Sequence, residues 1–186
     1  MGDRIIVLTV AVEGPVLGRG LIALNPALDV VHVETRTDLE RAVAAPEGAA
    51  RLIAFCTSVI IPALVLERLP GRAYNFHPGP PEYRGAHPAV FATHEGARNF
   101  GATAHEVVAE VDAGAIVGLE RFDVPAGTGR EALDALAYGA LVRLFHALAP
   151  RIARDMRPLA PLEGIAWSGP LRTRADARRL TLAARR

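Results

Sequence analysis

Short apolar runs rich in β-branched residues recur through the first third of the chain. Residues 5–12 form one such run, bounded by a Gly-Pro pair, and predict a buried strand. Residues 29–34 and 51–56 predict two further strands, and residues 37–45 between them predict a short helix with Asp38 as its cap. Strands that alternate with helices predict crossover connections, a mostly parallel sheet and an α/β fold class.

Proline and glycine punctuate the next stretch of the chain. Residues 14–26 contain three glycines and two prolines, so we expect any helix there to be short. A helix over 61–69 and a brief strand over 73–76 follow. Residues 77–86 hold three prolines and two glycines, which excludes a helix or a central strand. The sequence therefore predicts a stiff loop directly after a strand end.

The pattern beyond this loop changes from alternating units to a hairpin. Residues 87–95 predict a helix that ends at a glycine. Two strand-like runs, residues 101–110 and 115–124, flank a turn signal at 111–114. This arrangement predicts an antiparallel hairpin near the end of the sheet.

A long helix and an arginine-rich end complete the chain. Residues 128–154 carry one continuous apolar stripe, and Thr128 with Glu131 has the spacing of a capping box. Residues 171–186 contain six arginines and one acidic residue, which favours an exposed helix or a tail. We therefore expect a catalytic domain over 1–170 and a separate arginine-rich segment over 171–186.

Composition narrows the class of protein. The 186 residues are 51% apolar and 22% charged, as in one globular domain, and the net charge is +1. All 21 basic residues are arginine, so no lysine serves a Schiff base or a phosphate-binding loop. The single cysteine, Cys56, excludes an intrachain disulfide and a cysteine-based zinc site. The apolar run 59–66 is too short to span a bilayer, and no leader pattern opens the chain, so we expect a cytoplasmic protein without a membrane partner.

Three polar side chains stand where an α/β sheet carries its ligands. Asn75 and His77 alternate with Phe76, so in an extended strand they project to the same side. They lie at the carboxyl end of that strand, where ligands bind in open α/β sheets. Asp112 lies in the predicted hairpin turn, which we expect to fold over the same edge.

This set of residue types suits one kind of chemistry. The Asn75 amide can donate to a developing oxyanion. His77 can either carry a proton near neutral pH or act as a charged partner of the oxyanion, and Asp112 can orient the imidazole and favour its protonated form. Neither Ser58 nor Cys56 has the sequence surroundings of a nucleophile. The pattern therefore indicates direct transfer to an incoming nucleophile, without an acyl-enzyme. No two histidines have metal-ligand spacing with a carboxylate, so we expect no metal.

Four sequence blocks carry a resemblance to a known family. They are Asn-Phe-His-Pro at 75–78, Tyr-Arg-Gly-Ala-His-Pro at 83–88, Gly-Ala-Thr-Ala-His at 101–105 and Val-Asp-Ala-Gly-Ala-Ile at 111–116. These four blocks, in this order, resemble the motifs of the formyltransferase family that uses 10-formyltetrahydrofolate. The resemblance covers residues 51–154.

The resemblance implies a fold, a donor and a site. It implies a Rossmann-like domain with helices on both faces of the sheet, and a catalytic set that corresponds to Asn75, His77 and Asp112. It implies 10-formyltetrahydrofolate as the formyl donor. The folate would be held by two segments, through residues Ser58, Val59 and Ile60 and residues Val108, Ala109, Glu110 and Val111.

The sequence departs from the family in three respects. Gly-Pro-Pro-Glu at 79–82 replaces the usual Ser-Leu-Leu-Pro, residues 14–20 lack the phosphate-binding loop of glycinamide ribonucleotide enzymes, and no C-terminal barrel for tRNA follows. We therefore expect a small amine acceptor, with an amino sugar as the leading candidate, rather than nucleic acid. A 10-formyltetrahydrofolate hydrolase and a non-catalytic folate-binding or partner-binding module remain alternatives. The oligomeric state is open, a homodimer included.

Other candidate residues have simpler interpretations. We expect His105 to pack inward or to support the site. Arg84 is suited either to an acidic group of the acceptor or to a salt bridge that fixes its own loop. The arginines of 171–186 lack interleaved aromatic residues, so we expect a solvated helix face there.

Overall fold

A six-stranded sheet forms the centre of the protein. The computed structural model describes residues 3–45, 51–69 and 72–183. The strand order is β2-β1-β3-β4-β5-β6. The first four strands pair in parallel, and β5 and β6 pair antiparallel. The strands are β1 (Arg4–Leu8), β2 (Asp29–Val33), β3 (Arg51–Phe55), β4 (Ala73–His77), β5 (Asn99–Glu106) and β6 (Ile116–Asp123).

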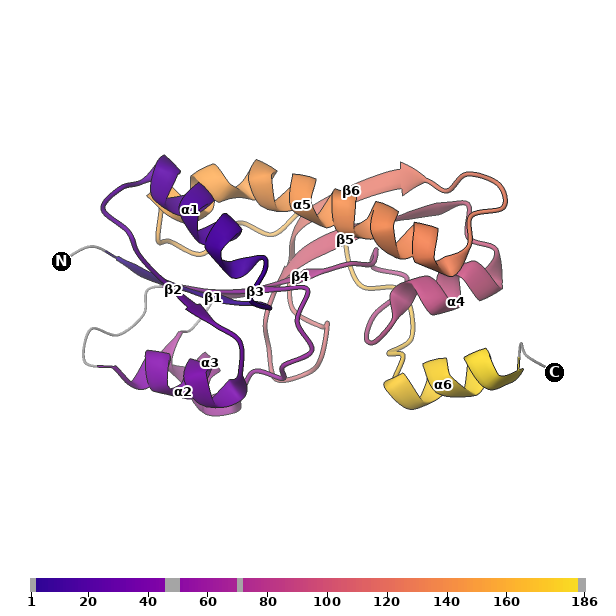
Figure 1. Cartoon of the computed structure of the whole chain (residues 1–186), viewed down its shortest axis with the longest axis horizontal. Helices are drawn as coiled ribbons and strands as arrows, with labels where there is room; N and C mark the ends of the chain where they lie inside the picture. Colours follow the sequence, from indigo (N-terminus) through magenta and orange to yellow (C-terminus); the bar gives the residue numbers. More distant parts are fainter. Residues whose placement is uncertain (1–2, 46–50, 70–71, 184–186) are drawn as a thin grey trace.

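Helices cover both faces of this sheet, as Figure 1 shows. Helices α1 and α5 lie on one face, α2 and α3 lie on the other, and α4 and α6 lie toward the end of the molecule that carries the C-terminus. The predicted α/β Rossmann-like fold with a hairpin is confirmed. The helices are α1 (Gly14–Leu24), α2 (Arg36–Ala44), α3 (Ala63–Arg68), α4 (Pro88–Glu95), α5 (Arg130–Arg154) and α6 (Arg174–Ala183).

The two faces of the sheet carry two separate hydrophobic cores. In β1, Ile5 and Val7 belong to the core under α1 and α5, whereas Ile6 and Leu8 belong to the core over α2 and α3. All four side chains have no exposed surface. A strand that is buried on both faces needs a continuous apolar run, which explains the pattern at the start of the chain.

Helix α1 is longer than its composition predicts, with eleven residues in a stretch where we expected a short helix. Gly14 and Gly18 lie on its buried face. A Cβ atom at Gly14 would stand 2.2 Å from the ring of His32, so only glycine allows this approach. The glycines therefore serve close packing against the sheet and do not interrupt the helix.

Two helices begin differently from their predicted caps. Helix α2 is capped by Thr35, whose hydroxyl accepts a hydrogen bond from the amide of Asp38 at 3.2 Å, so Asp38 is not the cap. Helix α5 begins after Gly129 without a side-chain cap, and the Thr128 hydroxyl instead donates to the carbonyl of Pro125 at 2.7 Å.

Helix α5 is the longest helix of the described residues, with 25 residues. By length and composition alone it is apolar enough to cross a membrane. In this fold its apolar side packs against the sheet, with Leu141 and Phe145 completely buried. Its hydrophobicity is therefore that of a core helix.

A buried arginine fixes the end of α5 to the sheet. Arg51 donates hydrogen bonds to the carbonyls of Ile152 at 2.9 Å and Arg157 at 2.6 Å, and its guanidinium lies over the ring of Tyr74 at 5.5 Å. Burial lowers the pKa of Arg51, although it remains a cation at ordinary pH. These bonds set the direction in which the chain leaves the helix.

The segment after α5, residues 155–173, crosses the molecule as an irregular strap. The amide of Leu162 donates to the carbonyl of Ile116 at 2.7 Å, and the amides of Ser168 and Gly169 both donate to the carbonyl of Pro81 at 3.2 Å. We name residues 155–173 the strap. It leads to α6, whose Ala177 is buried in the same cluster as α4.

Candidate active site

The end of β4 carries two polar side chains into a cavity. Asn75 and His77 both line it, as the alternation of an extended strand requires. β5 runs antiparallel beside β4, and its register places His105 opposite Asn75 and Thr103 opposite His77. The hairpin strand therefore adds a second imidazole to the edge that the sequence predicts.

Asp112 reaches this edge from the turn between β5 and β6. Its backbone has a φ of 45°, a left-handed conformation that points the side chain back toward the sheet. The amide of Gly85 donates to its Oδ2 atom at 2.7 Å. Gly114, two residues later, passes so close to the carbonyl of Glu106 that a Cβ atom would stand 2.0 Å from it. The Asp-Ala-Gly turn is thus shaped to present the carboxylate.

Three side chains meet around Asp112. Its Oδ2 atom lies 3.6 Å from Nδ1 of His77, and its Oδ1 atom lies 3.1 Å from Nε2 of His105. The Nδ2 atom of Asn75 lies 3.1 Å from Nε2 of His105 and 3.5 Å from Oδ1 of Asp112. The three residues predicted to form the catalytic set therefore converge, and His105 joins them.

The hydrogen bonds of His77 decide which ring nitrogen exchanges a proton. Its Nε2 atom lies 2.9 Å from the carbonyl oxygen of Tyr83, which only accepts, so Nε2 carries the hydrogen. Nδ1, which faces Asp112, is the nitrogen that titrates. Burial lowers the pKa of His77 and outweighs the raising effect of the Asp112 charge. At neutral pH the ring is therefore a neutral base.

Asp112 is the fixed negative charge of the site. Burial alone would raise its pKa, but the hydrogen bond from His105 and the positive charge of protonated His77 lower it. The hydrogen bond from Gly85 lowers it further, and the pKa is about 2. The carboxylate therefore remains ionised wherever His77 titrates.

His105 contacts the candidate catalytic groups directly, beyond the packing or supporting role that we predicted. Its Nδ1 atom lies 2.8 Å from the carbonyl of Glu106 and therefore carries a hydrogen. Its Nε2 atom faces both the Asn75 amide and the Asp112 carboxylate. The sequence contains no local signal for this contact, because it depends on the register in which β5 pairs with β4.

The strap adds an aromatic ring to this cluster. The Trp167 ring meets His105 edge to face with centroids 5.0 Å apart, and meets His77 in the same way at 6.0 Å. Its Nε1 atom donates to the carbonyl of Gly114 at 2.9 Å. The indole thus packs against both imidazoles and fixes the turn that carries Asp112, a role for which the local sequence gave no signal.

The loop after β4 is shaped around His77. A Cβ atom at Gly79 would stand 2.6 Å from Nε2 of His77, so the glycine that replaces the usual serine allows close packing here. The carbonyl of Gly79 accepts a hydrogen bond from the hydroxyl of Thr103 at 2.7 Å. Arg84 donates to Glu110 at 3.0 Å and to the carbonyl of Val111 at 2.9 Å. Of its two interpretations, the structure shows the salt bridge between loops.

The cluster opens into a cavity of about 570 Å³. Its lining includes Asn75, His77 and Asp112 together with every predicted folate-binding residue, namely Ser58, Val59, Ile60, Val108, Ala109, Glu110 and Val111. Residues 56–61 and 107–111 form one side, which we name the apolar wall. The backbone amides of 108–110 form no backbone hydrogen bond within the described part of the chain. The apolar wall thus offers both apolar contact and free polar groups to a flat ligand.

The opposite side of the cavity comes from two other segments. Residues 85–88 follow the proline-rich loop, and residues 171–174 end the strap and begin α6. We name these residues the arginine wall, after Arg172 and Arg174. We predicted a solvated helix or tail over 171–186. A helix is present up to residue 183, its first residue, Arg174, lines the cavity, and residues 184–186 lie outside the described residues.

Thiol chemistry and metal chemistry would each need particular groups at this site. Burial raises the pKa of the Cys56 thiol, so this cavity residue is not a ready thiolate nucleophile. Across residues 3–45, 51–69 and 72–183, no group of three or more His, Cys, Asp or Glu side chains is arranged to hold a metal ion. The groups that remain are acid–base and hydrogen-bonding groups.

Comparisons with known proteins bear on the family and the fold. A family model described as formyl transferase matches residues 34–137, more than half of the chain. No curated protein matches the chain significantly in sequence.

Solved structures share the fold at low sequence identity. The formyltransferase PseJ from Anoxybacillus kamchatkensis, solved with UDP-4,6-dideoxy-4-formamido-L-AltNAc and tetrahydrofolate, has a TM-score of 0.77 and 18% identity, over 97% of this chain and 90% of that one. A 4-N formyltransferase from Francisella tularensis has a TM-score of 0.71 and 18% identity, over 94% and 77%. An N-formyltransferase from Helicobacter canadensis, solved with folinic acid and dTDP-3-aminofucose, has a TM-score of 0.68 and 16% identity, over 95% and 72%.

Proposed function

Because this chain belongs to the formyl transferase family, we propose that it moves the formyl group of 10-formyltetrahydrofolate to the amine of a small acceptor at Asn75, His77 and Asp112. The observation that carries the proposal is the convergence of these three side chains in one cavity. Three residues from a strand end and a distant hairpin turn have hydrogen-bonding or ion-pairing separations of 3.5 Å and 3.6 Å. Structural packing alone does not require an ionised carboxylate and a neutral imidazole at the edge of a cavity.

The apolar wall suits the ring of the donor. Val59, Ile60 and Val111 give it aliphatic surface, and the free backbone groups of 108–110 can hydrogen-bond to the edge of a pterin. A volume of about 570 Å³ lies in the range of small-molecule sites. Two of the structures with the same fold were solved with tetrahydrofolate or folinic acid, which supports the same class of donor here.

The charges of the site suit attack by an amine on a formyl carbon. As the new C–N bond forms, the formyl oxygen becomes negative and the attacking nitrogen becomes positive. An N–H group of Asn75 is suited to donate to that oxygen. Nδ1 of His77 is suited to take the proton from the nitrogen, because its lowered pKa leaves it unprotonated at neutral pH.

Asp112 then stabilises the charge that His77 gains. The imidazolium faces the Asp112 carboxylate at 3.6 Å, and the carboxylate stays ionised because its pKa is about 2. When the tetrahedral carbon releases the donor nitrogen, His77 returns the proton to it. The bond to the acceptor is kept, the bond to the folate is broken, and no acyl-enzyme forms.

For the acceptor we propose an amino sugar linked to a nucleotide. The proline-rich loop and the strap shape the side of the cavity where the acceptor enters. The structures from Anoxybacillus kamchatkensis and Helicobacter canadensis that share this fold contain nucleotide-linked sugars. Their identities of 18% and 16% leave the particular sugar to experiment.

A screen of acceptors tests the proposal. Purified protein is incubated with 10-formyltetrahydrofolate and a panel of UDP- and dTDP-linked amino sugars, and the folate product is followed by absorbance. We expect turnover with at least one amino sugar and no turnover with the corresponding hydroxyl sugar. Asn75→Ala serves as the matched control for contaminating activity.

The same experiment separates the two alternatives. Formate released without any amine would identify a hydrolase. Absence of both reactions, together with a melting temperature that rises on addition of folinic acid, would identify a folate-binding module without catalysis.

A further inference from the structure

The strap holds its last residues in a defined position at the cavity. The amide of Arg172 donates to the carbonyl of Arg84 at 3.0 Å, and its carbonyl accepts from the amide of Ala86 at 2.9 Å. Its guanidinium lies 4.7 Å from the ring centre of Phe91 and pairs with Glu95 at 2.7 Å. The bonds to Arg84 and Ala86 of the proline-rich loop therefore fix the chain just before α6 begins.

Helix α6 is then capped in a way that fixes its first turn. The hydroxyl of Thr173 accepts from the amide of Asp176 at 3.2 Å, and the Asp176 carboxylate accepts from the amide of Thr173 at 2.9 Å. Such reciprocal bonds form a capping box. Ala177 is buried against α4, so the helix cannot swing away freely. The backbone of Arg174, the first residue of the helix, is therefore fixed by the cap before it and by the packing of Ala177 after it.

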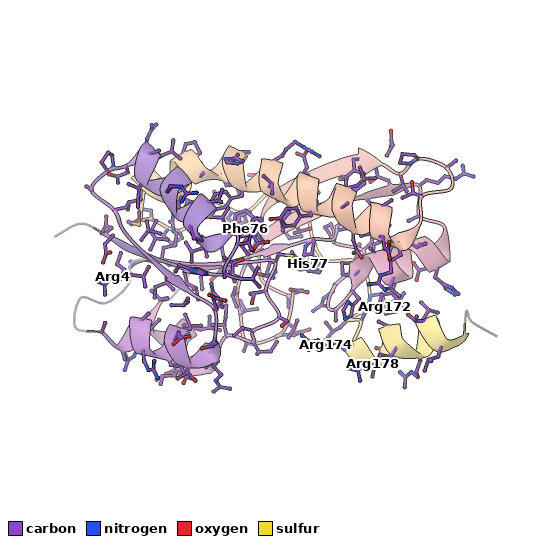
Figure 2. All side chains as sticks on the ribbon, in the orientation of Figure 1. Arg4, Phe76, His77, Arg172, Arg174 and Arg178 are labelled. Carbon is purple, nitrogen blue, oxygen red and sulfur yellow. The ribbon has the colours of Figure 1, made fainter. Side chains whose placement is uncertain are left out.

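Arg174 is a charge without a counterion. It lines the cavity, and within the described residues its side chain forms no ion pair and no hydrogen bond. The other ionised side chains of the lining are paired: Arg172 with Glu95, Glu110 with Arg84, and Asp112 with His105. Figure 2 shows Arg174 at the beginning of α6, with Arg178 one turn further along the helix. Arg178 does not line the cavity.

We infer that Arg174 binds a phosphate group of the acceptor. The planar guanidinium presents paired N–H donors that match phosphate oxygens, and a cation without a partner in the lining of a cavity favours an anion. With the donor ring on the apolar wall and the amine beside Asn75 and His77, the rest of the acceptor extends along the arginine wall. The choice of ligand rests on the proposed function, whereas the anion-binding role rests on the geometry of Arg174 alone.

Binding measurements test the inference without turnover. UDP, inorganic pyrophosphate and folinic acid are titrated calorimetrically into the full chain and into Arg174→Ala, Arg174→Lys and Arg178→Ala. We expect Arg174→Ala to raise the Kd of UDP about tenfold, as for loss of a charged hydrogen bond, and Arg174→Lys to recover part of it. Arg178→Ala removes the same charge from the same helix outside the cavity, and we expect its Kd to stay within about twofold of wild type.

Three results would overturn the inference. If UDP does not bind the wild-type chain, or binds Arg174→Ala equally well, Arg174 is not a phosphate ligand. If folinic acid rather than UDP loses affinity, Arg174 holds the donor's carboxylates. If Arg178→Ala has the same effect as Arg174→Ala, the general charge of α6 is responsible. A wild-type chain that binds UDP but not folinic acid would contradict the proposed function and leave the role of Arg174 intact.

Discussion

The two walls of the cavity are built in opposite ways. The apolar wall consists of two loops that follow β3 and β5, and both loops lie within the residues matched by the family model. In the arginine wall, residues 171–174 come from the strap and α6, beyond the matched residues 34–137. The apolar wall and the catalytic set thus lie within the residues that the family model matches, whereas the end of the strap and the start of α6 lie outside them.

The catalytic set belongs to neither wall, so we expect its substitution to have similar effects on the binding of folinic acid and of UDP. We predict that Asn75→Ala or His77→Ala lowers the rate of formyl transfer by about 10² or more, as for an oxyanion donor or a general base. Affinities for folinic acid and UDP should change far less, and circular dichroism should show the same fold. Wild-type rates in both variants would show that the reaction occurs elsewhere.

Asp112→Asn should change the pH profile as well as the rate. We expect kcat to fall about tenfold to a hundredfold, because the imidazolium of His77 loses its counterion. The Asp112 charge raises the pKa of His77 against burial, so without it that pKa falls further and the acid limb of the kcat profile moves to lower pH. A profile with its acid limb unmoved would count against this role of Asp112.

The lowered pKa of Asp112 also makes the stability of the fold depend on pH. Its pKa is about 2 in the folded chain against an ordinary value of 3.8, so it stabilises the fold above pH 3.8. This stabilisation is lost as the pH falls from 3.8 toward 2. Thermal melting at several acidic pH values should therefore show a smaller acid loss in Asp112→Asn than in the wild-type chain.

Gly85→Ala should disrupt the arginine wall and, through the Gly85 amide, the hydrogen bond to Asp112. Gly85 has a φ of 91°, and a Cβ atom there would stand 2.1 Å from the carbonyl of Arg172. We expect a loss of about 2 kcal/mol in the free energy of unfolding, measured with urea, because both strain and the clash must be relieved. The Kd of UDP should rise about tenfold, as in the Arg174→Ala variant. Gly20→Ala, where an added Cβ meets no atom within 4 Å, is the control.

Ile60→Ser gives the smallest effect and tests the other wall. Ile60 is 66% exposed on the apolar wall, so only the part of its side chain that a ligand covers contributes to binding. We expect the Kd of folinic acid to rise about threefold and the Kd of UDP to stay unchanged. An effect on UDP instead would mean that the assignments of the two walls are exchanged.

The sequence predicted most of the fold because its signals are local. The buried strands appear as apolar runs, the hairpin as two runs around a turn, and α5 as a periodic stripe. Helix α1 was underestimated because Gly14 and Gly18 were interpreted as breaks, whereas they allow contact with β2. That reason is a tertiary distance, which no local pattern contains.

The residues of the candidate site also fall into those that local sequence patterns predict and those that they do not. Asn75, His77 and Asp112 could be named because they stand in compact motifs at strand ends and turns. Trp167 and Arg174 could not, because the strap has no periodicity and its path depends on single backbone hydrogen bonds to distant loops, such as those to Pro81. His105 was visible only as a strand residue until the register with Asn75 was known.

The backbone around Gly85 pairs with Arg172 as an isolated bridge, and this pairing affects the order in which the cavity forms during synthesis. The Gly85 amide holds the Asp112 carboxylate, while the neighbouring residues Arg84 and Ala86 hold Arg172 through its backbone. Residues 171–174 leave the ribosome after every other part of the cavity has been synthesised. A nascent chain can therefore assemble the sheet and the apolar wall first, but the cavity remains open on one side until translation has passed α6.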